Sequence, residues 1–236
     1  MLLQAALNGP RTTAEHPAVP LTAAQLAEDA AACVAEGAAA IHLHPRDQDG
    51  AETLEPAVVD DVVRTVRERC GAPVGVSTGA WIEPDLERRL AHLRGWRAPD
   101  YASVNLSEEG HADVMRALLD AGVGIEAGVW TPQDAEALAA SGLADRVLRV
   151  LVEPLHTPRD EALAAAQAVH DALDAHGITA PRLQHGDGEA GWVLVEDAIA
   201  RRIATRVGLE DVLADPEGRQ VGNAALVAAA RTLGAG

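Results

Sequence analysis

The sequence predicts an α/β fold, a (β/α)8 TIM barrel, formed as a single domain by residues 1–236. Short apolar runs alternate with segments of helical periodicity along the whole chain, and this unit repeats eight times. Strands that alternate with helices pair in parallel through right-handed crossovers, and eight such units close into a barrel. An open doubly wound sheet is the alternative, but no G-x-G-x-x-G motif follows the first apolar run.

The expected strands coincide with the apolar runs, and a helix is expected after each one. The strands cover residues 2–7, 38–44, 73–79, 101–106, 122–130, 146–154, 180–186 and 202–211. The helices cover residues 22–36, 55–69, 84–94, 109–121, 131–140, 159–176, 188–201 and 217–233. The first helix carries clear boundary signals, because Thr22 is a favourable N-cap residue and Gly37 stands just past the end.

Composition and charge narrow the class of protein. Hydrophobic residues make up 48% of the chain and aromatic residues 2%, with no Phe, so Ala, Val, Leu and Ile must fill the core. A formal net charge of −17 makes nucleic acid and anionic membranes poor partners. Cys33 and Cys70 are expected to be buried free thiols, since two isolated cysteines form no disulfide framework. The sequence shows no signal peptide and no apolar run of about 20 residues, so a soluble cytoplasmic protein is expected.

Polar and ionisable residues gather at the carboxyl ends of the expected strands, where barrels of this type carry their active sites. In chain order they are Asn8, Arg11, His42, His44, Arg46, Ser77, Thr78, Ser103, Asn105, Glu126, Glu153, His185, Asp187, Arg206, Glu210 and Asp211. The middles of the same strands are mostly Ala, Val, Leu and Ile. This distribution predicts an enzyme pocket at one end of the barrel rather than a binding module or a scaffold.

Two histidines in the stretch "IHLH" are the sharpest signal of chemistry. A strand projects alternate residues onto one face, so His42 and His44 point the same way and favour a shared metal ion. A catalytic zinc site has three protein ligands and an open position. Glu210, at the end of the last strand, is the candidate third ligand, because that strand closes against the first and so lies near the second. The competing interpretations are two histidines satisfied by hydrogen bonds and a carboxylate that caps the next helix.

Other groups at the strand ends have two or more interpretations. Ser77 and Thr78, together with backbone N–H groups near Gly79, can hold a substrate carboxylate, as can Ser103 and Asn105 on the next strand. Ordinary capping and turn chemistry is the alternative. Glu126 and Glu153 are candidate pocket bases or ion-pair partners of Arg149 and Arg159. His185 is a candidate fourth metal ligand, a general acid–base group or a loop residue.

The remaining histidines and the tryptophans are assigned less specific places. The histidines expected on the surface are His16, His92, His111, His156, His170 and His176. The tryptophans expected to cover rims or packing seams are Trp81, Trp96, Trp130 and Trp192.

Five motifs together resemble the β-keto acid cleavage enzymes, the family of 3-keto-5-aminohexanoate cleavage enzyme. They are "HPAVPLT" (16–22), "EGAAAIHLHPRD" (36–47), "VSTG" (76–79), "SVN" (103–105) and "RVGLED" (206–211), in family order over nearly the whole chain. The resemblance implies a zinc-dependent (β/α)8 barrel, usually a homotetramer. It also implies an exchange of groups between a β-keto acid and acetyl-CoA, which gives acetoacetate and a new CoA thioester.

The resemblance further implies roles for individual residues. The implied zinc ligands are His42, His44 and Glu210, and the implied carboxylate-binding residues are Ser77 and Ser103. Arg206 and Asp211 would form the dyad that handles the acetyl-CoA methyl proton. These residue types suit the chemistry, because zinc on a keto oxygen acts as a Lewis acid and a positioned carboxylate serves as a general base.

The sequence departs from the family pattern at three points. Where the aminohexanoate enzyme has a glutamate that meets the substrate amine, this chain has Arg11, which repels an ammonium and suits an anionic or neutral substrate tail. Ser103 stands in place of a threonine and keeps the hydroxyl. The chain is also shorter than typical members, with shorter loops after the last three strands, which bears on CoA recognition.

The prediction from sequence is thus a Zn²⁺ enzyme acting on a β-keto acid and acetyl-CoA, assembled as a homo-oligomer of two or four chains. The alternative is an aldolase or hydrolase that uses the same metal ligands without CoA, and turnover in the absence of acetyl-CoA distinguishes it. A non-enzymatic barrel is the third hypothesis, and it predicts no bound metal.

Overall fold

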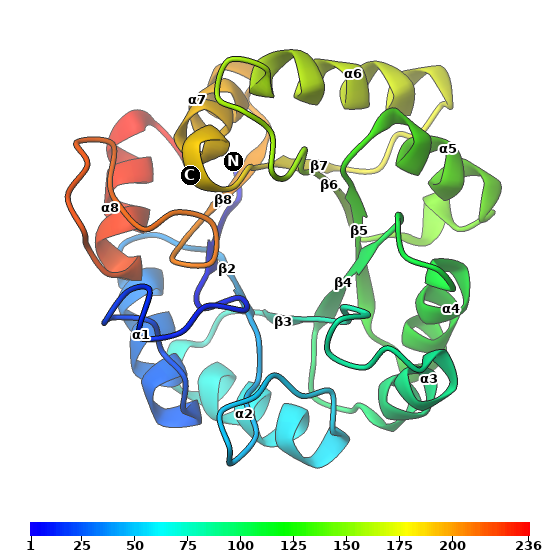
Figure 1. The fold of residues 1–236 in the computed structure, drawn as a ribbon, viewed down its shortest axis with the longest axis horizontal. Coiled ribbons are helices and arrows are strands. Elements are labelled where there is room, and N and C mark those ends of the chain that lie inside the picture. The colour runs from blue at the N-terminus through cyan, green and yellow to red at the C-terminus, as the bar shows by residue number, and fades with distance from the viewer.

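The structure, a computed structural model that describes residues 1–236, confirms the predicted barrel. Eight parallel strands pair in sequence order, and the last strand, β8 (Ala204–Val207), pairs with the first, β1 (Leu3–Ala6), to close the sheet. The eight α-helices form an outer ring around the strands (Figure 1). Every crossover therefore returns the chain to the same end of the barrel, so all eight carboxyl ends of the strands face one rim.

The helices and strands lie close to the expected ranges. The strands are β1 (Leu3–Ala6), β2 (Ala40–Leu43), β3 (Val74–Ser77), β4 (Tyr101–Asn105), β5 (Gly124–Val129), β6 (Arg149–Val152), β7 (Arg182–Gln184) and β8 (Ala204–Val207). The helices are α1 (Ala23–Ala35), α2 (Pro56–Cys70), α3 (Leu86–Gly95), α4 (His111–Ala121), α5 (Pro132–Ala140), α6 (Ala162–Ala175), α7 (Gly191–Arg201) and α8 (Asn223–Leu233). Thr22 is the N-cap of α1 in a capping box with Gln25, and Gly37 follows the helix with a positive φ, both as predicted.

Two expected elements near the C-terminus are shorter in the structure. The last strand ends at Val207 instead of residue 211, and the last helix begins at Asn223 instead of residue 217. A Cβ on Gly208 would lie 2.0 Å from the carbonyl oxygen of Ala6, so the chain turns here where only glycine fits. The turn separates Arg206, on the strand, from Glu210 and the residues beyond it.

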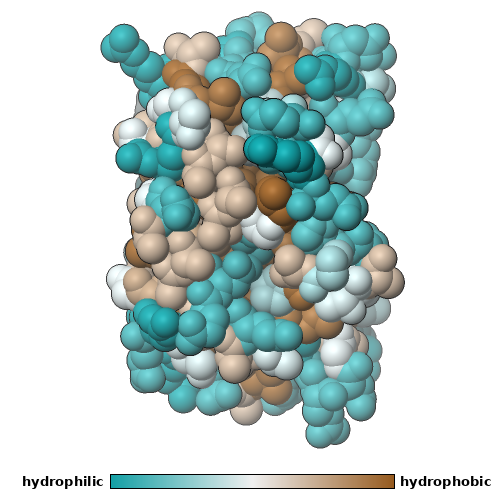
Figure 2. All heavy atoms as spheres, turned by 90° about the vertical axis from the view of Figure 1, so that its left-hand side faces the viewer, coloured by the Kyte–Doolittle hydropathy of each residue, from teal (hydrophilic) through white to brown (hydrophobic).

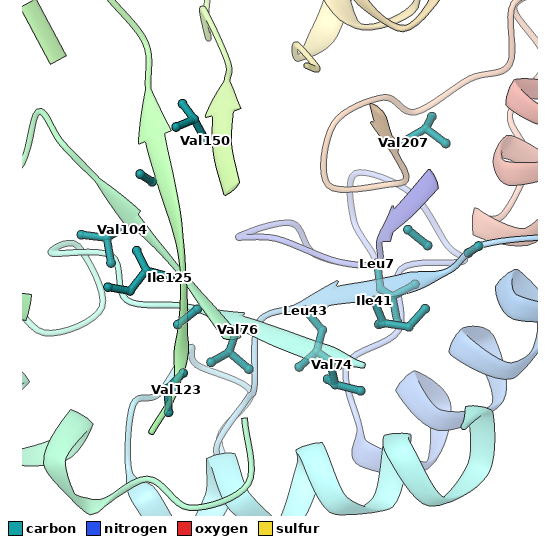
Figure 3. Packing of buried hydrophobic residues seen from close by; sticks show 14 of the residues in the cluster. Leu7, Ile41, Leu43, Val74, Val76, Val104, Val123, Ile125, Val150 and Val207 are labelled. Atoms are coloured by element: carbon teal, nitrogen blue, oxygen red, sulfur yellow. The ribbon is translucent and has the colours of Figure 1, made fainter. Parts of the chain in front are cut away.

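The main core lies between the strands and the surrounding helices. Fifty-three buried apolar residues form one cluster, and Val, Leu and Ala supply most of it, as the composition requires. Figure 3 shows Val74 and Val76 of β3 pointing away from the barrel axis toward α2, beside Ile41 and Leu43 of β2. Alternate residues of the same strands point into the barrel, which leaves His42 and Ser77 free to face the interior.

The interior of the barrel is polar toward its amino-terminal end. Gln4 donates to the hydroxyl of Tyr101 at 3.0 Å and to the carboxylate of Glu126 at 2.8 Å. Arg149 donates to the same carboxylate at 2.6 Å and lies over the Tyr101 ring. Gly75 leaves room for that ring, since a Cβ at this position would lie 1.9 Å from it. These buried groups form a floor beneath the open end of the barrel.

None of the helices combines the length and the apolar character that a membrane span requires. Figure 2 shows hydrophilic side chains over much of the face that carries α1 and α8, with smaller apolar stretches between them. Both cysteines are free; Cys33 is buried, whereas Cys70 is half-buried rather than fully buried as expected.

Two histidines expected on the surface are buried. His16 is 3% exposed, and its Nδ1 accepts a hydrogen bond from the backbone of Ala18. His170 is 4% exposed, because it lies on the inner face of α6 and contacts the side chain of Gln184 at 2.7 Å. The partner of His170 comes from β7, whereas that of His16 comes from its own loop, and each contact offsets part of the cost of burying the ring.

Replacing Gly75 with alanine tests the packing of the barrel floor. The new Cβ would displace the Tyr101 ring, whose hydroxyl donates to the carbonyl of Ile41 at 2.6 Å. We expect the free energy of unfolding to fall by about 1–3 kcal/mol in urea denaturation. Gly222→Ala is the matched control, because its Cβ would meet only Ala18 at 3.7 Å. Equal stability of the two variants would contradict this account.

Candidate active site and metal centre

The closure of the barrel places residues from the two ends of the sequence around one point. β1 lies between β2 and β8, with Ala6 opposite His42 and Gln4 opposite Arg206. His42 and His44 therefore face the interior two residues apart, and the turn after β8 carries Glu210 across the end of β1 to meet them. The predicted proximity of the last strand to the second is confirmed.

The three predicted metal ligands form a compact cluster. The Nε2 atoms of His42 and His44 lie 3.2 Å apart. Glu210 places Oε2 3.6 Å from Nε2 of His42 and Oε1 3.7 Å from Nε2 of His44. Ligands about 2.0–2.2 Å from a tetrahedral zinc ion stand about 3.3–3.6 Å apart, which matches this spacing. One carboxylate and two imidazoles also form a known catalytic zinc set.

The electrostatic environment of the His42–His44–Glu210 cluster favours a positive charge there. Burial lowers the pKa of His42 to about 3, so its ring is neutral and its nitrogen can act as a ligand. Burial opposes the charge on His44, but Glu210 and Glu52 outweigh it and raise the pKa of His44 to about 9. Burial likewise opposes the charge on Glu210, yet Arg206 and the two histidines hold its pKa well below the usual range. The Oε2 atom of Glu210 is buried without a hydrogen-bond partner, as expected of an atom that serves a metal.

Further contacts hold the histidines in place. Nδ1 of His44 lies 2.5 Å from the carboxylate of Glu52, and Trp81 donates to the other oxygen of that carboxylate at 3.2 Å. The side chain of Asn8 binds both the backbone N–H and the carbonyl of His44, at 2.8 and 2.9 Å. A carboxylate on the outer nitrogen of a histidine fixes the ring and its tautomer in metal sites. Glu52 was not predicted from the sequence, because it lies in a loop with no periodicity.

Arg206 connects the metal cluster to a second carboxylate. It donates to Glu210 at 2.9 Å and forms two hydrogen bonds to Asp211, at 3.0 and 2.7 Å. Arg206 and Asp211 are both buried. Burial raises the pKa of Asp211, although Arg206 and His185 act to lower it. A buried carboxylate with a raised pKa, fixed by a guanidinium, is suited to accept a proton from a substrate.

A cavity of about 600 Å³ opens above these groups. The predicted site residues that line it are Arg11, His42, His44, Ser77, Ser103, Asn105, Arg206, Glu210 and Asp211. The register of β3 and β4 places Ser77 directly beside Ser103. Thr78 does not line the cavity; its hydroxyl donates to the carbonyl of Ser103 at 2.7 Å and so links the two strands.

Arg11 lies at the edge of the cavity beside the metal cluster. Its Nε donates to the carbonyl of Glu210 at 3.0 Å, and its Nη1 pairs with Glu15 at 3.1 Å. The side chain is 22% exposed, so part of the guanidinium remains open to the cavity. Glu15 also lines the cavity and partly offsets the positive charge of Arg11.

The structure separates Glu126, which lies outside the cavity, from Glu153 and His185, which lie at the candidate site. Glu126 is fully buried in the barrel floor with Arg149, outside the cavity. Glu153 lines the cavity and contacts His185 at 2.7 Å, instead of pairing with Arg159. Five more residues of the cavity wall had no function assigned from the sequence, because loops bring them there: Pro10, Trp81, Trp130, Leu155 and His156.

Removing the Glu52 carboxylate tests its support of the metal cluster. We expect Glu52→Ala to weaken binding of a divalent metal such as Zn²⁺ about 10- to 100-fold, because His44 loses the group that orients its ring. Competition with a chromogenic chelator measures the affinity. Glu55→Ala, an exposed glutamate on the same loop, serves as the control and should bind the metal as the wild type does. Equal affinities of the two variants would refute the role of Glu52.

Solved structures share the fold of this chain at low identity. The apo structure of ObcA superposes with a TM-score of 0.72 and 19% identity, over 92% of this chain and 61% of that chain. An N-acetylmannosamine-6-phosphate 2-epimerase from Clostridium perfringens superposes with a TM-score of 0.59 and 12% identity, over 89% of this chain and 87% of that chain. At these identities the similarity shows the barrel fold alone.

Sequence comparisons give similarity to named relatives over part of the chain and to a family model over nearly all of it. The chain is 34% identical over 96 residues to a 3,5-dioxohexanoate:acetyl-CoA acetone transferase of Paraburkholderia graminis, covering 40% of this chain and 31% of that protein. It is 36% identical over 91 residues to a 3-keto-5-aminohexanoate cleavage enzyme of Fusobacterium nucleatum, covering 37% of this chain and 34% of that protein. The aligned segments thus span about a third of the length of these relatives. A sequence model of the family described as beta-keto acid cleavage enzyme matches residues 1–235, and the chain therefore belongs to this family.

Proposed function

We propose that the chain is a zinc-dependent enzyme that exchanges groups between a β-keto acid and acetyl-CoA, giving acetoacetate and a new acyl-CoA. One observation carries the proposal: a cluster of two histidines and a glutamate adjoins a buried Arg–Asp pair in a small cavity. Membership of the β-keto acid cleavage enzyme family supports it. The relative from Paraburkholderia graminis is named for a transfer that involves acetyl-CoA, which supports the choice of co-substrate.

The balance of atoms decides which proton Asp211 must remove. Acetoacetate consists of an acetyl group joined to a CH2–COO⁻ unit, and only the β-keto acid can supply the free carboxylate. The carbon between the keto and carboxylate groups, C2, must therefore bond to the acetyl carbonyl of acetyl-CoA. Because C2 is the nucleophile, Asp211 removes a proton from C2 of the β-keto acid and not, as the family resemblance implied, from the methyl group of acetyl-CoA. The released CoA thiolate then attacks the former keto carbon, whose bond to C2 breaks, and C2 regains a proton.

The residues of the cavity have matching roles in this scheme. Asp211 accepts the proton from C2, and Arg206 fixes the orientation of its carboxylate. Ser77, Ser103 and Asn105 face the cavity together and bind the substrate carboxylate by hydrogen bonds. Zinc held by the His–His–Glu cluster would supply a Lewis acid for the keto group of the substrate. We also expect a homo-oligomer in solution, which light scattering can measure.

Metal content is the first test. We expect about one zinc per wild-type chain in mass spectrometry of the purified protein, and loss of the metal in His44→Ala and Glu210→Ala. Each variant removes one of the three ligands and leaves an incomplete site. Circular dichroism serves as the control for folding. A wild-type protein that takes up no zinc would remove the basis of the proposed chemistry.

A β-keto acid screen with the zinc-loaded protein then tests the reaction. We expect acetoacetate to form only when both a β-keto acid and acetyl-CoA are present. Formation of products without acetyl-CoA would instead identify a CoA-independent aldolase or hydrolase. Asp211→Asn should lower kcat at least about 100-fold while the zinc content stays unchanged, because the general base is lost.

Arg11 is proposed to select the tail of the substrate. An unshared edge of its guanidinium binds a carboxylate and repels an ammonium, so a dicarboxylic β-keto acid should exceed the matched amino β-keto acid in kcat/KM by about tenfold. Arg11→Glu should reverse the preference. Competition between the two substrates in one reaction measures the ratio. A wild-type preference for the amino substrate would overturn the assignment.

A further inference from the structure

His185 is a fully buried histidine that lies between two carboxylates of the candidate site. Its Nε2 stands 2.7 Å from Oε2 of Glu153, and its Nδ1 stands 3.8 Å from Oδ1 of Asp211. The ring has no exposed surface, and Nδ1 has no hydrogen-bond partner. A buried ring nitrogen without a partner is costly, so its position facing the proposed base calls for a reason.

The partner on the far side of the ring is itself fixed. Oε1 of Glu153 accepts a hydrogen bond from the indole of Trp130 at 3.0 Å, which leaves Oε2 for His185. A Cβ on Gly128 would lie 2.3 Å from Oε1 of Glu153, so the glycine provides the space in which this carboxylate sits. Three neighbouring strands, β5 to β7, thus end in one connected unit of Trp130, Glu153 and His185.

This arrangement specifies which ring nitrogen carries the proton. A carboxylate only accepts hydrogen bonds, so Glu153 selects the tautomer with the proton on Nε2 of His185. The Nδ1 atom then presents a free lone pair toward Asp211. The distance of 3.8 Å is longer than a hydrogen bond, but catalytic contacts of this kind shorten when substrate is bound. The charged groups that face the ring are Glu153, at the end of β6, and Asp211, with Arg206 behind it.

We propose that His185, oriented by Glu153 and Trp130, is a positioning residue for Asp211 that receives the proton which Asp211 removes from the substrate. The inference rests on the proposed function, because it assigns Asp211 as the base. His185 acts through Asp211 and does not line the cavity.

The step balances without an added reactant. Asp211 takes the proton from C2 of the β-keto acid, and the electron pair of the C–H bond stays on carbon. The O–H bond then breaks while an N–H bond forms at Nδ1 of His185, which restores the Asp211 carboxylate. The resulting imidazolium is paired with Glu153. After the bond between C2 and the keto carbon breaks, the same proton returns through Asp211 to C2 of acetoacetate.

Steady-state kinetics of zinc-loaded variants test the proposal. We expect His185→Ala to lower kcat about 10- to 100-fold, with KM and zinc content close to those of the wild type. His185→Gln keeps a donor for Glu153 and an acceptor for Asp211 but cannot take the proton. Its kcat should therefore lie between those of the wild type and His185→Ala. The losses in Glu153→Gln and in the double variant His185→Ala/Glu153→Gln should resemble that of His185→Ala, because residues of one unit are not additive.

His170 provides a matched control. It is a buried histidine that contacts Gln184, the residue next to His185, and it lies outside the cavity. His170→Ala should leave kcat unchanged. Loss of zinc from His185→Ala in proportion to its lost activity, or a kcat equal to that of His170→Ala, would overturn the proposal. A wild-type protein without exchange activity would instead refute the proposed function.

A spectroscopic measurement tests the geometry independently of turnover. In the zinc-loaded protein labelled with ¹⁵N-histidine, the signals absent from His185→Gln belong to His185. We expect them to show a protonated Nε2 and an unprotonated Nδ1. A proton on Nδ1 in the resting protein would exclude this atom as an acceptor and overturn the proposal.

Discussion

The pairing of β1 with both β2 and β8 is the constraint on which the site depends. Two glycines allow the close contacts that this closure of the barrel requires. Gly208 lets the turn after β8 pass against the carbonyl of Ala6, and Gly9, with a φ of +53°, leaves room for the side chain of Glu210. Any larger residue at either position would push the turn away from the end of β1. The cluster of His42, His44 and Glu210 exists because the first and last parts of the chain fit together at these points.

A second feature of the molecule is the concentration of buried charge along the barrel axis. The floor pairs Arg149 with Glu126, and the layer above it pairs Arg206 with Glu210 and Asp211. Burying an ion pair costs several kcal/mol of desolvation per ion, which good geometry and further hydrogen bonds offset. Such an interior contributes little to stability compared with the apolar layer outside the strands. Its value lies in holding carboxylates at fixed positions in a medium of low dielectric constant.

The acidic character of the protein gives the proposed metal a clear electrostatic purpose. A chain with a net charge of −17 is a poor host for an anionic β-keto acid. Within the cavity, Arg11 and Arg206 are each paired with carboxylates, so they only partly offset this field. A divalent cation in the His–His–Glu cluster would reverse the local sign and allow an anionic substrate to bind. The serine hydroxyls of β3 and β4 then need only orient the substrate carboxylate.

The sequence by itself determined the barrel, its strands to within a few residues, and the members of the His–His–Glu cluster. It did so because the alternation of apolar runs and helices repeats along the chain, and because His42 and His44 share one face by strand geometry alone. The tertiary structure decided which side chains the loops and the strand register bring into contact. It placed Glu52 behind His44, turned Thr78 away from the cavity, and buried His16 and His170. It also joined Glu153 to His185 and aimed that ring at Asp211. The Thr78–Ser103, Glu153–His185 and His185–Asp211 contacts link residues far apart in the chain, so no local pattern of sequence records them.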